Sequence, residues 1–474
     1  FASRGDTCSA TGLYCLHLFV PKPVKGLSTM KMYSNGDWIS GISEMDVVNP
    51  YTGNPFDTVP SATLEDVEKA IDSAGRGVIA MRALSAFDRY EILMRAVDLL
   101  KERRQDFGET ITREEGKVIS EGLLEVDRCI QTITWSAEEA KRLFGETIPL
   151  DAAPGNEMKF GFTVRVPVGI VVAISPFNFP LNLVAHKVGP AIAGGNAVVI
   201  KPASDTPLSA LKLTEVLIDA GLPAEAIQCL TGSGSVIGDA LVSNPAVRKV
   251  TFTGSQEVGE RITHTAGLKK VTMELGSNSP LIVLPDADMD KVVAATVQSG
   301  YSNAGQVCIS TQRAIVDRSV YGDYLDALTP IVEALSTGDP MQDAVNVGPM
   351  VRESDAERVE SWIQEAVGAG AKLVTGGIRD GAVLSPALLA DVNQDMRFSR
   401  DELFGPAVGV TPVSGINEAI EFANDTRFGL SAAIFTENID NALKFALEVD
   451  SGNLNINGGT QFRADLMPYG GLKD

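Results

Sequence analysis

Residues 168–283 alternate short apolar runs with amphipathic stretches, and this alternation constrains the fold more than any other feature of the chain. The runs GIVVAISP, NAVVIKPA and VRKVTFTGS read as strands, whereas LNLVAHKVGPAIAGG and EVGERITHTAG have helical spacing. Strands and helices that alternate at these lengths predict a parallel sheet with helices on both faces. Ligands of such sheets bind at the carboxyl ends of the strands, where SPFNFP, KPASD, TGSG, FTGS and ELGS all fall.

The remaining chain predicts a second α/β lobe and a projecting hairpin. Residues 64–145 have long helical periodicity, and Thr63 begins the first helix with Glu65 or Asp66 completing a capping box. GETIPL and KFGFTVRVPVG are extended segments on either side of the turn-rich DAAPGNEM. Strands and helices alternate again from about residue 290 to 450. Residues 1–29 have no sustained periodicity, and we expect them to lie outside the fold as an N-terminal extension.

Composition excludes several classes of partner. The net charge is −21, and the negative electrostatic potential of such a chain repels nucleic acid and anionic lipid. An anionic substrate would therefore need positively charged side chains at its binding site. No apolar run approaches the ~18–20 residues that span a bilayer. The cysteines and histidines have no metal-binding spacing, and the cysteines number five, so we expect no metal site, no disulfide framework and a cytoplasmic location.

Two short motifs leave alternatives open when they are taken alone. In FTGSQEVG, Gly254 and Gly259 flank Ser255 where a strand enters a helix, which suits either a pyrophosphate or merely a tight turn. In YSNAGQVCIS, Cys308 lies in a short polar stretch after a helical run. Most free cysteines are small buried hydrophobes, so Cys308 needs further support before it is taken as a nucleophile.

Six motifs in fitting order supply that support. SPFNFP, KPASDTP, FTGSQEVG, MELGSNSP, GQVC and ELFGP together resemble the aldehyde dehydrogenase superfamily over residues 30–474. The resemblance implies an α/β fold: a cofactor-binding domain with a five-stranded Rossmann-like parallel sheet (30–144 and 168–274), an oligomerisation hairpin (145–167) and an α/β catalytic domain (275–474). Within the superfamily, the chain resembles the branches that oxidise lactaldehyde, succinate semialdehyde or, without phosphorylation, glyceraldehyde 3-phosphate.

The resemblance also implies the catalytic residues. Cys308 of GQVC matches the nucleophile that attacks the aldehyde carbonyl. Asn178 of PFNFP matches the amide of the oxyanion hole, although alone it reads as a turn residue before a proline. Glu274 of MELGS matches the general base for thioester hydrolysis, although alone it reads as a surface carboxylate. Coenzyme A-acylating relatives commonly lack this Glu, so we expect a free carboxylic acid as product.

A dinucleotide site is implied by further matches. Lys201 of KPASD resembles the lysine that contacts the adenosine ribose, while Glu402 and Phe404 of ELFGP match residues that hold the nicotinamide ribose and ring. Backbone near Gly254, Ser255, Gly259 and Gly276 completes the predicted cofactor set.

The position three residues after Lys201 departs from the family pattern. Members that prefer NAD usually carry Glu there, whereas this chain has Ser204. Loss of the carboxylate removes repulsion toward a 2′-phosphate, and the hydroxyl can donate to that phosphate. Asp205 restores some negative charge. The sequence therefore favours NADP and leaves NAD open.

Three arginines are candidates for binding an anionic substrate. Arg128, Arg313 and Arg463 resemble arginines that bind anionic ends in some branches, although a structural role fits each of them too. The chain stops at MPYGGLKD, where family members continue to a final strand that pairs with a neighbouring subunit. We therefore expect a homodimer or homotetramer only with a complete C-terminus.

Two alternative functions stay open from the sequence. The first is a coenzyme A-acylating relative, against which Glu274 argues. The second is a non-catalytic binding or structural relative, which has no chemical need for Cys308, Asn178 and Glu274 together.

Overall fold

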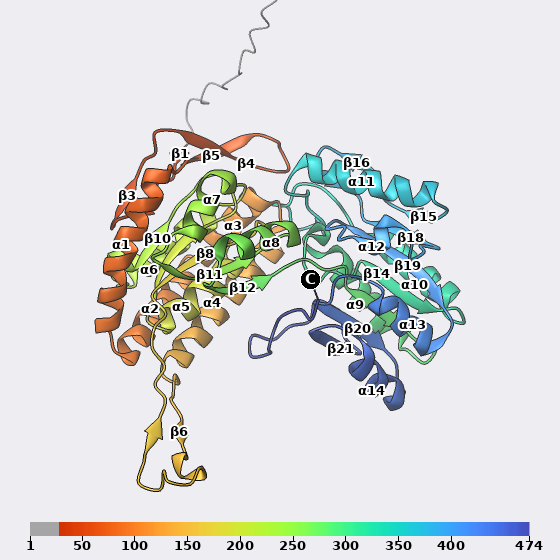
Figure 1. Cartoon of the computed structure of the whole chain (residues 1–474). Helices are drawn as coiled ribbons and strands as arrows, with labels where there is room; N and C mark the ends of the chain where they lie inside the picture. The colour runs from red at the N-terminus through yellow and green to blue at the C-terminus, as the bar shows by residue number, and fades with distance from the viewer. Residues whose placement is uncertain (1–27, 474) are drawn as a thin grey trace, which may run out of the picture.

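The computed structural model describes residues 28–473, which form two lobes, each built on a mainly parallel sheet (Figure 1). The sheet of the first lobe has the order β12-β11-β8-β9-β10-β2-β3. Its strands are β12 (Lys270–Glu274), β11 (Val247–Thr253), β8 (Ile170–Ile174), β9 (Ala197–Lys201), β10 (Ile227–Cys229), β2 (Met32–Ser34) and β3 (Asp37–Ile39). The first five are parallel, which confirms the predicted five-stranded sheet, and β2 and β3 extend it antiparallel.

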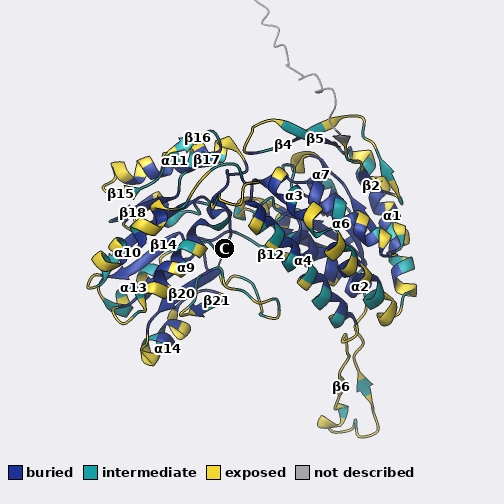
Figure 2. Cartoon of the chain, turned by 180° about the vertical axis from the view of Figure 1, so that it is seen from behind, coloured by how far each residue is buried: buried dark blue, intermediate teal, exposed yellow. Residues whose placement is uncertain are grey.

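Helices cover this sheet and enclose the first hydrophobic core. They are α1 (Leu64–Ala83), α2 (Ala86–Glu102), α3 (Arg104–Glu115), α4 (Ile119–Ala140), α5 (Asn182–Ala193), α6 (Leu208–Asp219), α7 (Gly234–Ser243) and α8 (Gln256–Ala266). The predicted capping box at Thr63 is present, with Asp66 as its partner. β8 and β9 are buried along their whole length, as expected for a sheet covered on both faces. Figure 2 shows the buried residues gathered in the interior of each lobe.

The sheet of the second lobe has the order β15-β18-β19-β14-β13-β20-β21, and only β15 is antiparallel to its neighbour. Its strands are β15 (Lys372–Thr375), β18 (Ala387–Ala390), β19 (Ala407–Val413), β14 (Arg313–Asp317), β13 (Pro280–Val283), β20 (Ser431–Phe435) and β21 (Asn453–Ile456). The helices of this lobe are α9 (Met289–Tyr301), α10 (Tyr321–Glu333), α11 (Glu353–Gly368), α12 (Arg397–Arg400), α13 (Gly415–Asn424) and α14 (Ile439–Glu448).

The chain crosses between the lobes directly after β12. Because β12 ends at Glu274 in one sheet and β13 begins at Pro280 in the other, residues 275–279 bridge them. The carboxyl ends of β8, β9, β11 and β12 meet at the edge of the first sheet from which this bridge leaves. The topology therefore places the predicted motifs at the boundary between the two lobes.

The smaller elements lie at the periphery. β6 (Thr147–Ile148), the 3₁₀ helix η1 (Leu150–Ala152) and β7 (Gly161–Phe162) form a hairpin that projects from the first lobe (Figure 1). β4 (Glu44–Val48) and β5 (Pro55–Pro60) form a separate sheet with β1 (Ser28–Thr29). Pairing of β1 with β5 corrects the predicted boundary of the N-terminal extension, because residues 28 and 29 are part of the fold. Residues 1–27, on which the rest of that prediction falls, lie outside the described part.

Three further short segments complete the description. They are η2 (Ala224–Ala226), η3 (Ser302–Gly305) and the hairpin of β16 (Arg379–Asp380) with β17 (Val383–Leu384). Across residues 28–473, none of the helices combines the length and the apolar character needed to cross a bilayer.

Candidate active site

A sharp turn positions Cys308 after α9. Asn303, Ala304 and Gly305 all adopt left-handed backbone angles, with φ of 51°, 51° and 68°. Asparagine tolerates this region, but a Cβ on Gly305 would lie 2.0 Å from the carbonyl oxygen of Gly405. Such backbone is held only when its surroundings determine it. Here the Asn303 main-chain N–H donates to both carboxylate oxygens of Glu121, at 3.1 and 3.0 Å.

The Cys308 thiol is partly exposed and lies 3.4 Å from the hydroxyl of Tyr469. Burial raises the pKa of Cys308 to about 11, the Tyr469 hydroxyl opposes that rise, and the carboxylates of Glu402 and Glu274 add to it. Both carboxylates therefore lie close enough for their charge to reach the sulfur. A thiol in this environment is mostly protonated at neutral pH, and nearby positive charge would be needed to activate it.

Asn178 lies in the loop between β8 and α5, where its side chain is buried. Its amide donates to the carbonyl oxygen of Gln306 at 2.8 Å, two residues before Cys308. An amide nitrogen carries two N–H groups, so this bond leaves one donor for another acceptor. The structure therefore brings the predicted oxyanion donor to the loop that carries the predicted nucleophile.

Glu274 is the last residue of β12 and faces the same region. Burial raises the pKa of Glu274 to about 7, while Lys187 and Arg463 oppose that rise. One of its carboxylate oxygens is buried without a hydrogen-bond partner among residues 28–473. A carboxylate with a pKa near neutrality and a free oxygen can accept a proton from water. Lys187, which donates to the Thr253 hydroxyl, supplies positive charge beside it.

Glu402 approaches the backbone of the bridge between the lobes. Its carboxylate accepts a hydrogen bond from the Ser277 N–H at 3.0 Å, and a Cβ on Gly276 would lie 2.1 Å from one of its oxygens. Glycine at 276 is therefore required by this approach. Phe404, at φ 49°, places its ring edge-on to Phe177 at 5.8 Å.

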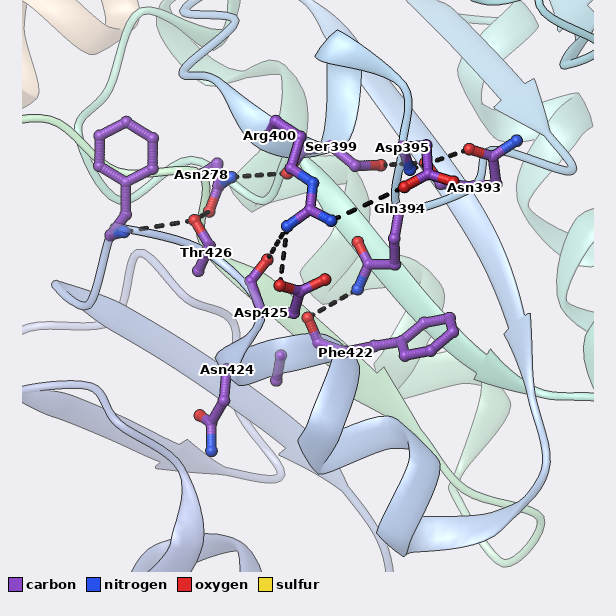
Figure 3. A network of polar contacts seen from close by, with 12 residues as sticks. Asn278, Asn393, Gln394, Asp395, Ser399, Arg400, Phe422, Asn424, Asp425 and Thr426 are labelled. Carbon is purple, nitrogen blue, oxygen red and sulfur yellow. Dashed lines mark hydrogen bonds and ion pairs between the residues drawn. The ribbon is translucent and has the colours of Figure 1, made fainter.

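A polar network fixes the loop that carries Glu402 (Figure 3). Asn278 donates to the Ser399 carbonyl oxygen at 2.8 Å and accepts from the Thr426 hydroxyl at 3.2 Å. Arg400 donates to the Asp425 carboxylate at 2.7 Å. The network therefore ties the bridge after Glu274 to the segment before Glu402.

Arg313 belongs to this structural layer, which corrects its prediction as a substrate ligand. Its side chain is buried and donates to the main-chain carbonyl oxygens of Asn278, Phe422 and Ala423, at 3.1, 2.9 and 3.2 Å. A buried guanidinium held by three carbonyl groups has little capacity left for a ligand. Arg313 is the first residue of β14, and its burial follows because β14 is the central strand of its sheet.

Lys201 and Ser204 lie at the carboxyl end of β9. The Lys201 ammonium group donates to the Pro202 carbonyl oxygen at 2.7 Å, and burial lowers the pKa of this lysine to about 8. The Ser204 hydroxyl donates to the Gly232 carbonyl oxygen at 3.1 Å. Asp205 is bound by both arms of the Arg352 guanidinium from the second lobe, one at 2.9 Å. Arg352 therefore offsets the charge of Asp205 beside Ser204.

The N-terminus of α8 fits a phosphate group. Ser255 is its N-cap residue, but its hydroxyl makes no capping hydrogen bond. Gly259 packs so closely that a Cβ would lie 2.6 Å from Leu275, and a Cβ on Gly254 would lie 2.5 Å from the ring of Phe252. The free N–H groups of the first helical turn, the helix dipole and a free hydroxyl suit an anionic oxygen. With Lys201 at one end and Glu402 at the other, these residues fit a dinucleotide.

Arg128 and Arg463 come together from opposite ends of the chain around Asp465. The Asp465 carboxylate lies 3.3 Å from Arg128, 3.7 Å from Arg463 and 3.9 Å from His186. Arg463 also contacts the His186 ring nitrogen at 3.0 Å. Burial, together with Arg463, lowers the pKa of His186 to about 4, so this histidine is neutral. Two guanidinium groups thus share one carboxylate, which leaves a net positive charge.

This arginine pair is linked to the nucleophile through Tyr469. The Arg463 guanidinium lies 4.8 Å from the centroid of the Tyr469 ring, whose hydroxyl contacts Cys308. The Nε atoms of Arg128 and Arg463 are buried, and neither has a hydrogen-bond partner within the described chain. Buried donors without partners are costly, and an anionic ligand would satisfy them.

Sequence reasoning did not assign roles to Tyr469, His186 and Asp465. Tyr469 lies in the short motif PYGG, which gives no catalytic signal, and His186 is a single histidine on a helix, which gives no signal of its own. Proximity of Asp465 to Arg463 in sequence is the one available indication, because a carboxylate two residues from an arginine can pair with it.

Comparison with known proteins decides the family. The profile described as the aldehyde dehydrogenase family matches residues 38–474. The chain belongs to the aldehyde dehydrogenase family. It is 47% identical to the 3-sulfolactaldehyde dehydrogenase of Priestia aryabhattai over 93% of this chain and 92% of that one.

Solved structures of aldehyde dehydrogenases have the same fold. Aldehyde dehydrogenase 21 of Physcomitrella patens, in complex with the reaction product succinate, has a TM-score of 0.92 at 38% identity and covers 94% of this chain and 93% of its own. The NADP-dependent glyceraldehyde-3-phosphate dehydrogenase of Bacillus halodurans C-125, complexed with NADP, has a TM-score of 0.92 at 37% identity and covers 94% of each chain.

This membership establishes the activity class. The chain is an NAD(P)-dependent aldehyde dehydrogenase, which oxidises an aldehyde to a carboxylic acid. The three relatives above are named as dehydrogenases, and none is named as a coenzyme A-acylating enzyme or a structural protein. Neither alternative left open by the sequence has support from these comparisons.

Proposed function

We propose that this aldehyde dehydrogenase oxidises a small aldehyde that carries an anionic group, with Cys308 as nucleophile, Asn178 as oxyanion donor and Glu274 as general base. The observation that carries the proposal is the pair Arg128 and Arg463, whose buried Nε atoms have no hydrogen-bond partner within residues 28–473. Arg463 lies against the ring of Tyr469, whose hydroxyl contacts Cys308. The relatives described above act on 3-sulfolactaldehyde or glyceraldehyde 3-phosphate, or were solved with succinate.

The proposed reaction begins when the Cys308 thiol gives its proton to solvent. The resulting thiolate attacks the aldehyde carbon, and a carbon–sulfur bond forms as the carbonyl π electrons move onto the oxygen. The free N–H of the Asn178 amide donates to the resulting alkoxide, whose negative charge would otherwise be unsatisfied in a buried site. A dinucleotide held by Lys201, Ser255 and Glu402 would supply the hydride acceptor, and loss of hydride from the same carbon would leave a thioester on Cys308. Glu274 then takes a proton from water, the hydroxide attacks the thioester, and the acid leaves as the Cys308 sulfur regains its electron pair.

Charge supports an anionic substrate over a neutral one. The chain has a net charge of −21, so general attraction does not bring an anion to the site. The two arginines exceed Asp465 by one positive charge, and the low pKa of His186 prevents this histidine from adding another. A carboxylate, phosphate or sulfonate a few bonds from the aldehyde carbon would accept from both free Nε groups.

We further propose NADP as the preferred cofactor. Ser204 replaces the usual carboxylate beside Lys201, and Arg352 offsets Asp205, the remaining negative group at this position. A 2′-phosphate would therefore meet Lys201 and a hydroxyl rather than an unpaired carboxylate. The proposed cofactor-binding domain comprises residues 28–144 and 168–274, and the proposed catalytic domain comprises residues 275–474.

We expect the purified enzyme to prefer NADP and anionic aldehydes in matched pairs of substrates. Succinate semialdehyde against butanal, and glyceraldehyde 3-phosphate against glyceraldehyde, differ mainly in the anionic group. Two charge-assisted hydrogen bonds at about 1.5–3 kcal/mol each predict a ratio of kcat/KM of about 10²–10⁴ within a pair. Steady-state rates with each cofactor and each aldehyde measure it.

Replacing Arg463 by leucine tests which contact produces the preference. We expect Arg463→Leu to reduce the ratio for anionic over neutral aldehydes while the rate with neutral aldehydes stays within about threefold. Arg313→Leu is unsuitable as a control, since that side chain supports the fold; Arg261→Leu, on the exposed face of α8, is the matched one. Equal rates within every pair in the unmodified enzyme would refute an anionic substrate.

We also propose that the protein is a homo-oligomer that buries the β6–β7 hairpin. The hairpin is coloured mainly as exposed in Figure 2. Seven apolar side chains on and around it are exposed in the single chain: Phe144, Ile148, Met158, Phe160, Phe162, Val164 and Val166. Clustered exposed apolar groups of this kind are typical of contacts between subunits. We expect analytical ultracentrifugation to find a dimer or tetramer and the double substitution F160E/F162E to yield monomers. Ile79→Glu, at an exposed site on α1, should not dissociate it.

A cytoplasmic location is the last part of the proposal. Cys129, Cys229 and Cys308 are free thiols in the described chain, and a free nucleophilic thiol persists best in a reducing compartment. Fractionation of cells with an antibody to the protein tests this location, and recovery from an oxidising compartment would contradict it.

A further inference from the structure

A buried cluster of charged groups lies at the turn between α3 and α4, and the reaction outlined above does not use it. We name Glu115, Lys117, Glu121 and Glu125 the α3–α4 cluster. Glu115, Lys117 and Glu125 are buried, and Glu121 is partly buried. Buried charges are costly to desolvate, so a cluster of four calls for a structural or functional reason.

Lys117 binds the main chain of Asn178. Its ammonium group donates to the Asn178 carbonyl oxygen at 2.9 Å and to Glu125 at 2.7 Å. It also lies 3.8 Å from the centroid of the Phe179 ring. Burial opposes its charge, but attraction to Glu125 and Glu115 outweighs burial and raises the pKa of Lys117, so it stays protonated.

Glu125 fixes the other side of the same loop. Its second carboxylate oxygen accepts hydrogen bonds from the N–H groups of Leu181 and Asn182, both at 2.9 Å. These groups lie at the start of α5, where a carboxylate is favoured by the helix dipole. The ion pair of Lys117 and Glu125 therefore holds residues 178 and 181–182 from one side.

Glu121 holds the loop of the nucleophile. It accepts from the Asn303 N–H, as described above, and the Asn303 side-chain amide donates to the carbonyl oxygens of Asn178 and Gln306, at 3.2 and 3.4 Å. The Asn178 carbonyl oxygen thus receives hydrogen bonds from Lys117 and from Asn303. One cluster is bonded to both loops that form the proposed oxyanion site.

We propose that Lys117 and Glu121 are positioning residues, which fix the Asn178 amide relative to Cys308 so that its free N–H meets the developing alkoxide. This inference rests on the proposed roles of Asn178 and Cys308. Lys117 acts on the Asn178 main chain, and Glu121 acts through Asn303 on the turn that leads to Cys308. A small displacement of an oxyanion donor weakens it where charge develops, and has little effect on cofactor binding.

The experiment is a double-mutant cycle on the rate of the first turnover. Lys117→Met combined with Glu125→Gln removes both partners of the ion pair, so that neither of these two residues stays charged without the other. We expect first-turnover formation of NADPH to slow by about 10–100-fold, less than or equal to the loss from Asn178→Ala, because removing an oxyanion donor costs ~10²–10³-fold. The Kd for NADPH should stay within about twofold.

The cycle distinguishes positioning from general destabilisation. In the Asn178→Ala background, the Lys117→Met/Glu125→Gln pair should slow the first turnover by less than about twofold further. Independent, multiplicative losses, or an unchanged rate in the pair alone, would overturn the inference. Lys212→Met, which removes an ion-paired lysine that contacts α3 outside the cluster, is the matched control and should leave the rate unchanged.

Three further outcomes separate the proposed role of Asn178 from the positioning role of the cluster. If Asn178→Ala alone does not slow the reaction, the proposed role of Asn178 fails and this inference falls with it. If Asn178→Ala is slow while the pair is not, only the positioning role fails. If the Lys117→Met/Glu125→Gln variant does not fold, Glu121→Gln takes its place in the cycle. A first-turnover rate that falls threefold or more, but does not fall further in the Asn178→Ala background, supports the inference. An unchanged rate in Glu121→Gln overturns it.

Discussion

Cys308→Ala is expected to abolish aldehyde oxidation while leaving cofactor binding intact. The thiol is the one sulfur nucleophile that the described structure places beside Asn178, Glu274 and Tyr469. Alanine cannot form the carbon–sulfur bond, and removal of a catalytic nucleophile typically costs ~10⁴–10⁶-fold in kcat. NADPH formation at saturating aldehyde measures the loss, and fluorescence titration with NADPH measures the Kd.

The buried cysteines provide the control for this prediction. Cys129 and Cys229 are fully buried, and burial raises the pKa of Cys229 to about 12, so neither thiol is expected to react. Cys229→Ala removes only a buried side chain that packs in the core, so the folded variant should keep its turnover. Among the three cysteines of residues 28–473, iodoacetamide should alkylate Cys308 first, about tenfold faster per pH unit between pH 7 and 10, because its pKa lies near 11. Full turnover by Cys308→Ala would contradict the proposed mechanism.

Local sequence patterns predicted the fold because each pattern coincides with a real physical requirement. Buried parallel strands need continuous apolar runs, and GIVVAISP and NAVVIKPA became β8 and β9, buried along their length. The capping box at Thr63 satisfies free N–H groups within one turn, so it too can be read locally. The catalytic motifs fall at strand ends that the topology brings together.

The rest of the site depends on contacts between distant segments, which no local pattern encodes. Arg128 and Arg463 are separated by more than three hundred residues, and only the folded chain brings both to Asp465. Arg313 follows Cys308 closely in sequence, yet its strand carries it into the interior, where carbonyl groups bind it. Spacing from a nucleophile therefore predicted a substrate contact where the sheet provides a structural one.

Glu274→Gln is expected to separate the two halves of the reaction. The amide keeps the shape of the side chain but cannot accept a proton from water, so the thioester should accumulate on Cys308. We expect a burst of NADPH close to one per active site, followed by steady-state turnover slower by about 10²–10⁴-fold, the usual contribution of a general base. Stopped-flow absorbance measures the burst, and intact-protein mass spectrometry detects the acyl group.

The pH dependence distinguishes Glu274 from the other carboxylate near the sulfur. The pKa of Glu274 is raised to about 7, so below pH 7 this group holds a proton and cannot act as a base. Hydrolysis of the thioester should therefore rise about tenfold per pH unit up to pH 7 and level off above it. Burial also raises the pKa of Glu402 to about 7, so Glu402→Gln is the control. Glu402→Gln should keep the rise in thioester hydrolysis up to pH 7, whereas Glu274→Gln should lose this rise. If hydrolysis still rises up to pH 7 in Glu274→Gln, or if this variant gives no burst of NADPH, another group activates the water.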